Sequence, residues 1–206
     1  MDIRHNIPMS DLCSAGSEAG ECSMAELIAP RCRNVLEIGA GAEGNVSQAI
    51  QRSLSDPSKH IAFEVDKSAY DAHRAMMEKR GLKHELVHGL ASSLPLDTVK
   101  QVLGGDVHCI ISDCEACLLD FFGTDVGKDA LKTAEFISNE MDGFVSNDTH
   151  DVELRRLWAR AGLCPTTKSF GCNRDCDTEL WRRSTCVNIK EKCANKAQDW
   201  GCEYLG

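Results

Sequence analysis

Long apolar runs, internal repeats and low-complexity tracts are all missing from this sequence, and proline occurs only five times. No stretch approaches the roughly 18 to 20 apolar residues that a membrane-spanning helix needs, which excludes such a helix. Residues 1–20 are polar and hold no apolar core of a signal peptide. From 206 residues without linkers we expect one domain over residues 1–206, a cytoplasmic location and no membrane partner.

An excess of basic residues is also missing. The chain has 23 Lys and Arg against 32 Asp and Glu, a formal net charge of −9. The imbalance lies in residues 1–150, with 13 basic and 24 acidic residues, whereas residues 151–206 have ten basic and eight acidic ones. Because this charge opposes attraction to a polyanion, we expect no nucleic-acid partner and favour a neutral or cationic small molecule.

The twelve cysteines show no paired CxxC pattern of a structural zinc site, and we predict no metal. Without an export signal, free thiols are the expected state, with disulfides in the last 45 residues as the alternative in an oxidising compartment. Cys114 and Cys117 form one CxxC motif. It lacks the N-terminal βαβ unit and the cis-proline loop that accompany a thioredoxin-type redox motif. We therefore interpret this pair as packing residues near the sheet.

Apolar runs alternate with helical patterns, which is typical of an α/β fold. After residue 162 the alternation stops and two strand-like segments follow. We predict a Rossmann-like, doubly wound mixed sheet of about seven strands with an antiparallel C-terminal hairpin. The expected strands are 34–38, 60–64, 86–88, 107–112, one from 143, and 165–170 with 179–185; the expected helices include 45–54, 68–79, 97–102, 117–122, 129–141 and 151–161.

A glycine-rich turn, GAGAEG at residues 39–44, directly follows the first predicted strand and opens a helix. Such a turn lets a ligand approach the backbone at a helix N-terminus. Glu64 ends the next strand, where a carboxylate can accept both hydroxyls of a ribose. The alternative is a tight strand–helix turn without a ligand.

Glu37 distinguishes among nucleotide cofactors. A carboxylate just before the turn repels a dinucleotide pyrophosphate but attracts a cofactor with a cationic amino-acid end, such as S-adenosylmethionine. The segment VLEIGAG at residues 35–41 resembles motif I of class I S-adenosylmethionine-dependent methyltransferases. The segments at 62–64 (AFE) and 111–116 (ISDCEA) loosely resemble those of FkbM-type members, with Val65 and Ala116 departing from that pattern.

This resemblance implies a set of cofactor contacts at the carboxyl ends of the parallel strands. Glu37, Gly39 and Gly41 would hold the methionine end. Glu64 would bind the ribose, and His88 and Gly89 would lie beside the adenine. Asp113 would lie at the mouth shared by cofactor and substrate. Residues 1–29 would form a helical segment on the substrate side, and 186–206 a cysteine-containing tail.

Three residues are candidates for catalysis. Asp113 and Glu115 follow the fourth strand and offer carboxylates that orient a substrate and accept its proton. His150 offers a base that titrates near neutral pH. Asn147 and Asp148, at the end of the predicted fifth strand, show in reversed order the pair that holds a divalent cation with a fourth-strand Asp in catechol-type O-methyltransferases.

The resemblance therefore implies a methyltransferase that uses S-adenosylmethionine to methylate a small-molecule hydroxyl. Two alternatives stay open: a non-catalytic protein that binds the cofactor and acts through protein contacts, and a nicotinamide-dependent oxidoreductase. The identity of the acceptor and the oligomeric state do not follow from the sequence.

Overall fold

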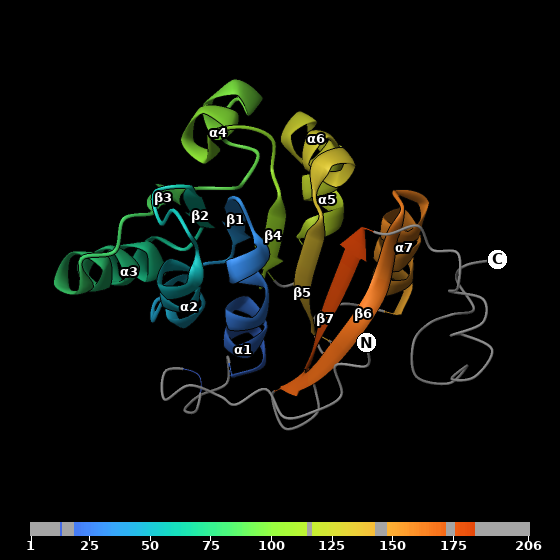
Figure 1. The fold of residues 1–206 in the computed structure, drawn as a ribbon, viewed down its shortest axis with the longest axis horizontal. Coiled ribbons are helices and arrows are strands. Elements are labelled where there is room, and N and C mark those ends of the chain that lie inside the picture. Colours follow the sequence, from blue (N-terminus) through green and yellow to red (C-terminus); the bar gives the residue numbers. More distant parts are fainter. Residues whose placement is uncertain (1–12, 14–18, 115–116, 143–147, 172–175, 184–206) are drawn as a thin grey trace.

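The computed structural model describes residues 13, 19–114, 117–142, 148–171 and 176–183. Its helices and strands alternate as predicted (Figure 1). In chain order they are α1 (Ala19–Ile28), the 3-10 helix η1 (Ala29–Arg31), β1 (Val35–Ile38), α2 (Asn45–Ser53), β2 (His60–Glu64), α3 (Lys67–Arg80), β3 (Glu85–His88), α4 (Leu96–Leu103), β4 (Cys109–Ser112), α5 (Leu118–Gly123), α6 (Asp125–Thr133), β5 (Phe136–Asp142), α7 (Asp148–Arg160), β6 (Leu163–Gly171) and β7 (Cys176–Arg183).

The seven strands form one sheet in the order β3-β2-β1-β4-β5-β7-β6. The strands β1 to β5 run parallel, while β7 lies antiparallel between β5 and β6. The order reverses between β1 and β4, and the turns after these two strands meet at the carboxyl edge of the sheet. The predicted mixed, doubly wound sheet with an antiparallel C-terminal hairpin is confirmed.

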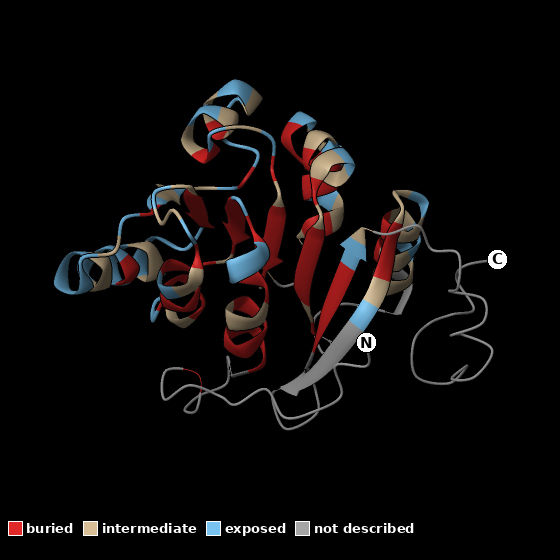
Figure 2. Cartoon of the chain, viewed as in Figure 1, coloured by how far each residue is buried: buried red, intermediate tan, exposed pale blue. Residues whose placement is uncertain are grey.

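Two buried clusters of hydrophobic residues cover the two faces of the sheet. Neighbouring residues of β1 belong to different clusters, because successive side chains of a strand point to opposite faces. Leu36 and Ile38 belong to the cluster with α4, α5, α6 and α7, whereas Val35 belongs to the cluster with α1 and α2. Figure 2 shows the central strands buried and the outer helix surfaces exposed. No described helix has the length and apolar character needed to cross a membrane.

The fifth strand corrects the predicted helix over residues 129–141. The helix α6 ends at Thr133, whose Oγ1 donates to the carbonyl of Val107 at 3.0 Å, and β5 then begins at Phe136. Ala130, Ala134, Ile137 and Met141 recur at spacings of three or four residues, which imitates a helical face. β5 is nevertheless a central strand, covered on both faces, where alternation of polar and apolar residues is lost.

The cysteines also differ from expectation, since those that the structure describes form disulfides. Three of the pairs are Cys13–Cys22, Cys32–Cys109 and Cys114–Cys117, and Cys164 is disulfide-bonded as well. The expected free thiols are therefore wrong, and the CxxC motif is a disulfide. Cys32 and Cys109 are 77 residues apart but meet because Val35 pairs with Cys109 in the sheet. The predicted tail at 186–206 lies outside the described residues, and α1 (Ala19–Ile28) lies within the segment 1–29.

Removing the Cys32–Cys109 disulfide is expected to cost more stability than removing Cys114–Cys117. The first closes a loop of 77 residues and the second a loop of three. Loop-closure entropy predicts losses of roughly 4 and 2 kcal/mol for the two Cys→Ala double variants. Urea unfolding without reductant measures the difference. The prediction would be contradicted if both double variants lost the same free energy of unfolding. It would also be contradicted if adding reductant left the stability of the wild type unchanged.

Candidate functional site

The turn after β1 and the loop after β4 are in direct backbone contact. The Asp113 N–H donates to the Ile38 carbonyl at 2.9 Å. A Cβ added to Gly39 would lie 1.7 Å from the Asp113 carbonyl oxygen, and Gly39 has a φ of +81°. Only glycine satisfies both conditions. The structure thus brings together Gly39 and Asp113, which the sequence placed in one site.

Glu64 connects the glycine-rich turn to the end of β2 through hydrogen bonds of its carboxylate. Its Oε2 accepts the Gly41 N–H at 2.9 Å, and its Oε1 accepts the Asp66 N–H at 2.7 Å. The side chain is buried, at 7% exposure. Each carboxylate oxygen keeps a second lone pair, so both can still accept a ligand hydroxyl. This geometry suits the predicted ribose contact.

Glu37 lies beneath the turn rather than at the surface. Its carboxylate is 1% exposed, and Oε2 accepts Ser47 Oγ at 2.5 Å and His60 Nε2 at 2.8 Å. Gln51 fixes the His60 tautomer: its Oε1 accepts the Lys83 N–H, so its Nε2 faces His60 Nδ1 and donates to it. The other Glu37 oxygen, Oε1, is buried without a hydrogen-bond partner. Burial raises the pKa of Glu37 to about 7.

A chain of buried histidines continues from this pair to the glycine-rich turn. His60 stacks on His84 with 4.7 Å between ring centroids, and His84 Nε2 lies 3.1 Å from His73 Nε2. His73 Nδ1 donates to the Gly41 carbonyl at 2.8 Å. Burial lowers the pKa of His60 to about 3 and also lowers that of His84. Gly41 is consequently held through its N–H by Glu64 and through its carbonyl by His73.

Two exposed apolar side chains lie next to these polar groups. Val65 follows Glu64 at the end of β2, and Leu90 follows Gly89 after β3, with 64% and 58% exposure. The strand ends adjoin, because Glu64 pairs with His88 and the Gly89 N–H donates to the Glu64 carbonyl. They are the large exposed hydrophobic side chains of the described chain. Apolar surface beside a ribose-type carboxylate suits a planar base.

Three carboxyl groups gather at the ends of β4 and β5. Ser112 pairs with Asn139, so Asp113 and Glu140 are the next residues on neighbouring strands. Thr178, the partner of Glu140 on β7, donates from Oγ1 to Glu21 Oε1 of α1 at 3.1 Å. Burial, with hydrogen-bond-range contacts to Asp113 and Glu21, raises the pKa of Glu140 far above its usual range. Sequence reasoning missed Glu140 because of the misassigned helix, and nothing in the sequence marked Glu21.

The remaining catalytic candidates do not join this group in the described structure. Glu115 and Asn147 lie outside the described residues. The fifth strand ends at Asp142, and Asp148 begins α7, so the prediction that residues 147–148 end the fifth strand is wrong. His150 lies in the first turn of α7, with Nδ1 3.4 Å from Asp151 Oδ1.

One group of possible metal ligands occurs in the described part of the chain. It consists of Cys32, His108 and Cys109, whose donor atoms lie within 4.8 Å of one another. The two sulfur atoms are joined in a disulfide and do not offer thiolates. This cluster therefore does not form a metal site in the oxidised protein.

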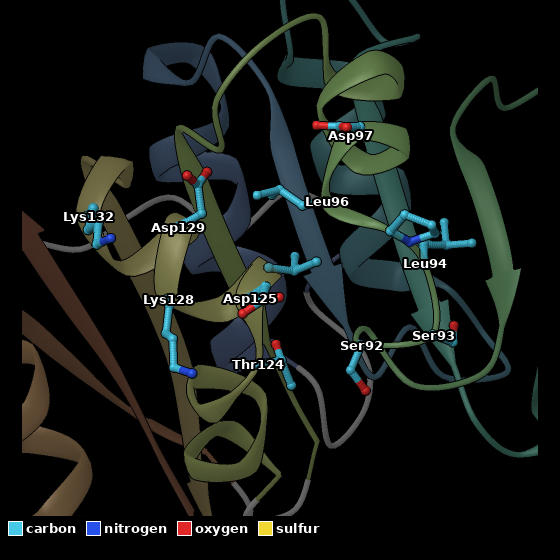
Figure 3. Close-up of a pocket in the computed structure, with 12 residues that line it drawn as sticks. Ser92, Ser93, Leu94, Leu96, Asp97, Thr124, Asp125, Lys128, Asp129 and Lys132 are labelled. Carbon is cyan, nitrogen blue, oxygen red and sulfur yellow. The ribbon is translucent and has the colours of Figure 1, made fainter.

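A cavity of about 770 Å³ lies beside α4 and α6 (Figure 3). Ser92, Ser93 and Leu96 come from the α4 side, and Thr124 and Lys128 from the α6 side. None of Glu37, Gly39, Gly41 or Glu64 lines it. Since none of the predicted cofactor-binding residues on the glycine-rich turn or at the end of β2 lines this cavity, the site is better assigned to the strand ends.

Comparison with solved structures identifies the fold. The O-methyltransferase TomG of Streptomyces achromogenes, involved in tomaymycin synthesis and bound to S-adenosylmethionine, superposes with a TM-score of 0.61 at 17% identity, covering 84% of this chain and 82% of TomG. A Bacillus cereus O-methyltransferase in complex with S-adenosylhomocysteine superposes with a TM-score of 0.57 at 20% identity, with 84% of each chain covered. Sp1610 of Streptococcus pneumoniae, a candidate tRNA (m1A22) methyltransferase, superposes with a TM-score of 0.57 at 13% identity, covering 87% of this chain and 81% of Sp1610. This chain has the fold of these methyltransferases. No protein-family model and no curated protein matches the sequence.

Gly39→Ala is expected to destabilise the protein and disrupt the turn. The new Cβ meets the Asp113 carbonyl at 1.7 Å in a left-handed conformation, which should cost at least about 3 kcal/mol. Gly81→Ala is the matched control: its φ is +66°, but nothing lies within 4 Å of the added Cβ. It should cost about 1 kcal/mol. Denaturant unfolding compares the two, and equal effects would argue against the contact with Asp113.

Glu37→Gln is expected to change how stability depends on pH. The Glu37 pKa rises from 4.5 to about 7 on folding, so the folded state keeps a proton that the unfolded chain releases. The resulting stability is complete below pH 4.5 and is lost as pH rises through 7. Over this window the wild type should lose roughly 3 kcal/mol relative to the variant.

Urea unfolding of both proteins, from below pH 4.5 to above pH 7, tests this difference. The depressed pKa of His60 acts in the other direction, with stability lost as pH falls from 6.5 toward about 3. Because both proteins contain His60, the difference between their curves reports Glu37. Parallel curves would show that Glu37 is ionised in the folded state.

Proposed function

We propose that the chain transfers a methyl group from S-adenosylmethionine to the hydroxyl group of a small molecule. The observation that carries the proposal is the grouping of the glycine-rich turn, Glu64, Val65 and Leu90 at one edge of a methyltransferase-type sheet. TomG and the Bacillus cereus enzyme, which share this fold, are described as O-methyltransferases and hold S-adenosylmethionine or S-adenosylhomocysteine.

The residues present fit an adenosine-containing cofactor with a cationic end. The free lone pairs of Glu64 accept the ribose hydroxyls, and Val65 and Leu90 cover the faces of the adenine, beside His88. The turn at Gly39 and Gly41 admits the methionine end close to the backbone. Glu37 places its carboxyl group beneath this end, with a buried Oε1 that lacks a hydrogen-bond partner.

The cofactor supplies a methyl group already activated on a positively charged sulfur, so the protein mainly has to position the acceptor and exclude water. Asp113, in backbone contact with Gly39, faces the point where cofactor and acceptor meet and accepts the hydroxyl proton. Glu115 and His150 are the further proposed catalytic groups. The FkbM-type subfamily is part of the same proposal, resting on the segments at 62–64 and 111–116.

Charge supports a small acceptor rather than RNA. Sp1610 shows that the fold also occurs in a candidate tRNA methyltransferase. Binding of RNA draws on lysines and arginines that neutralise phosphates. The net charge of −9, concentrated in the part of the chain that forms the cofactor edge, opposes such binding.

The disulfides bear on where the protein works. Three cysteine pairs, including Cys32–Cys109 between buried elements, are typical of an oxidising compartment. They favour such a compartment over the cytoplasm that the polar N-terminal residues suggested.

Calorimetric titration with S-adenosylmethionine, S-adenosylhomocysteine and NAD tests the proposal. The first two should bind, and NAD should not. Val65→Asp should weaken S-adenosylhomocysteine at least tenfold without loss of stability, because an exposed side chain is replaced by one that repels the adenine face. Glu78→Ala, an exposed carboxylate of α3, is the control that should leave binding unchanged.

The outcomes separate the alternatives. Binding of NAD alone would replace the proposal with an oxidoreductase. Binding of S-adenosylmethionine without methyl transfer to any hydroxyl in an acceptor panel would favour the non-catalytic cofactor-binding protein. If no nucleotide binds, the glycine-rich turn serves only the fold.

A further inference from the structure

Three carboxyl groups, those of Asp113, Glu140 and Glu21, come together at the ends of β4 and β5. Asp113 and Glu140 are neighbours across the two strands and are both partly exposed. Glu21 lies behind them on α1, at 1% exposure, and Thr178 holds its Oε1. All three acidic groups meet at the end of the sheet where an acceptor has to approach Asp113.

Glu21 carries the observation that points to a ligand. Its Oε2 is buried and has no hydrogen-bond partner, while its other oxygen is satisfied by Thr178. A buried carboxylate oxygen is costly unless a donor reaches it, and an ammonium group with three N–H donors would satisfy it better than the single proton of Glu140. Thr178, which holds the other Glu21 oxygen, is the cross-strand partner of Glu140, so the Glu21 carboxylate lies next to this group.

The arrangement suits an organic ammonium better than a divalent metal ion. Mg²⁺ and Ca²⁺ need several oxygens converging at 2.0 to 2.6 Å from one point. Among the described residues, the Cys32 group is the one whose three donor atoms all lie within 4.8 Å of one another. Glu21, Asp113 and Glu140 do not meet this condition as a set of three. An ammonium group carries three N–H donors that spread toward separate acceptors.

We propose that the methyl acceptor carries a primary ammonium group, which Asp113 and Glu140 bind over the buried carboxylate of Glu21. The inference rests on the proposed function, since it names the class of acceptor for the same site. It also matches the acidic excess of residues 1–150. The ammonium anchors the acceptor, and its hydroxyl is then presented beside Asp113.

Binding should release a proton from Glu140. In the free protein, burial and the neighbouring carboxyl groups of Asp113 (β4) and Glu21 (α1) keep Glu140 protonated, while β7 presents the uncharged Thr178. An ammonium ion between these groups favours the ionised form, so its arrival expels the proton. Affinity should therefore rise with pH, by up to about tenfold per pH unit while the ligand stays cationic.

The test is titration of the full chain, with S-adenosylhomocysteine present, by ethanolamine and tyramine. Their neutral partners are ethylene glycol and 4-ethylphenol, all at fixed ionic strength. Each amine should bind at least tenfold tighter than its neutral partner. Calorimetry in two buffers of different ionisation enthalpy should show release of about one proton.

Glu140→Gln should reduce the preference for amines to less than about threefold and abolish the proton release. Glu21→Gln should weaken the preference as well, and Glu78→Gln on α3 is the control that should change neither. Amines that bind no better than their neutral partners would overturn the proposal. So would MgCl₂ binding that depends on Glu140 while the amines show no preference.

Failure of the proposed function stays distinguishable. If S-adenosylhomocysteine does not bind, the methyltransferase proposal is wrong, and titration without it still decides whether the carboxyl groups select ammonium. If it binds and the amines show no preference, only this inference fails.

Discussion

The contact between Gly39 and the backbone of Asp113 is the constraint on which the rest of the site depends. It joins the turn after β1 to the loop after β4 across the point where the strand order reverses. No side chain fits at Gly39, so the two loops are held at the distance of bare backbones. In the proposed function, a cofactor bound on one loop and an acceptor held by the other would thereby be within reach of each other.

Beneath this contact lies a polar network that the hydrophobic core surrounds. Glu64 and His73 hold the two sides of the Gly41 peptide, and His60 with Glu37 supports the strands below. Buried groups of this kind contribute little net stability, because desolvation offsets their hydrogen bonds. Their physical effect is to fix the backbone conformation of the turn before a ligand arrives.

Much of this was accessible from the sequence, because the turn and the strands before it carry strong local signals. Glycines at 39 and 41 after an apolar run, and an acid at the end of the next run, predict the β1–β2 edge correctly. Val65 and Leu90 were available in the sequence too, but only the structure shows that both side chains are exposed beside Glu64.

The errors lie where local pattern and tertiary position disagree. β5 has the apolar spacing of a helix, and its misassignment displaced the expected polar residues at the strand end from Glu140 to Asn147 and Asp148. Glu21 and Thr178 are 157 residues apart and meet only because α1 packs on the antiparallel hairpin. The Cys32–Cys109 pair likewise follows from the register of β1 with β4, which no spacing encodes.

Electrostatics connects the two halves of the carboxyl edge. Glu37 and Glu140 both have raised pKa values, chiefly because burial penalises their ionised forms. Each holds its proton until a positive charge arrives nearby. A methyl donor with a cationic sulfur and an acceptor with an ammonium group would repel each other in an apolar cleft. Carboxyl groups placed along the strand ends, able to ionise as each cation enters, allow both to occupy one small site.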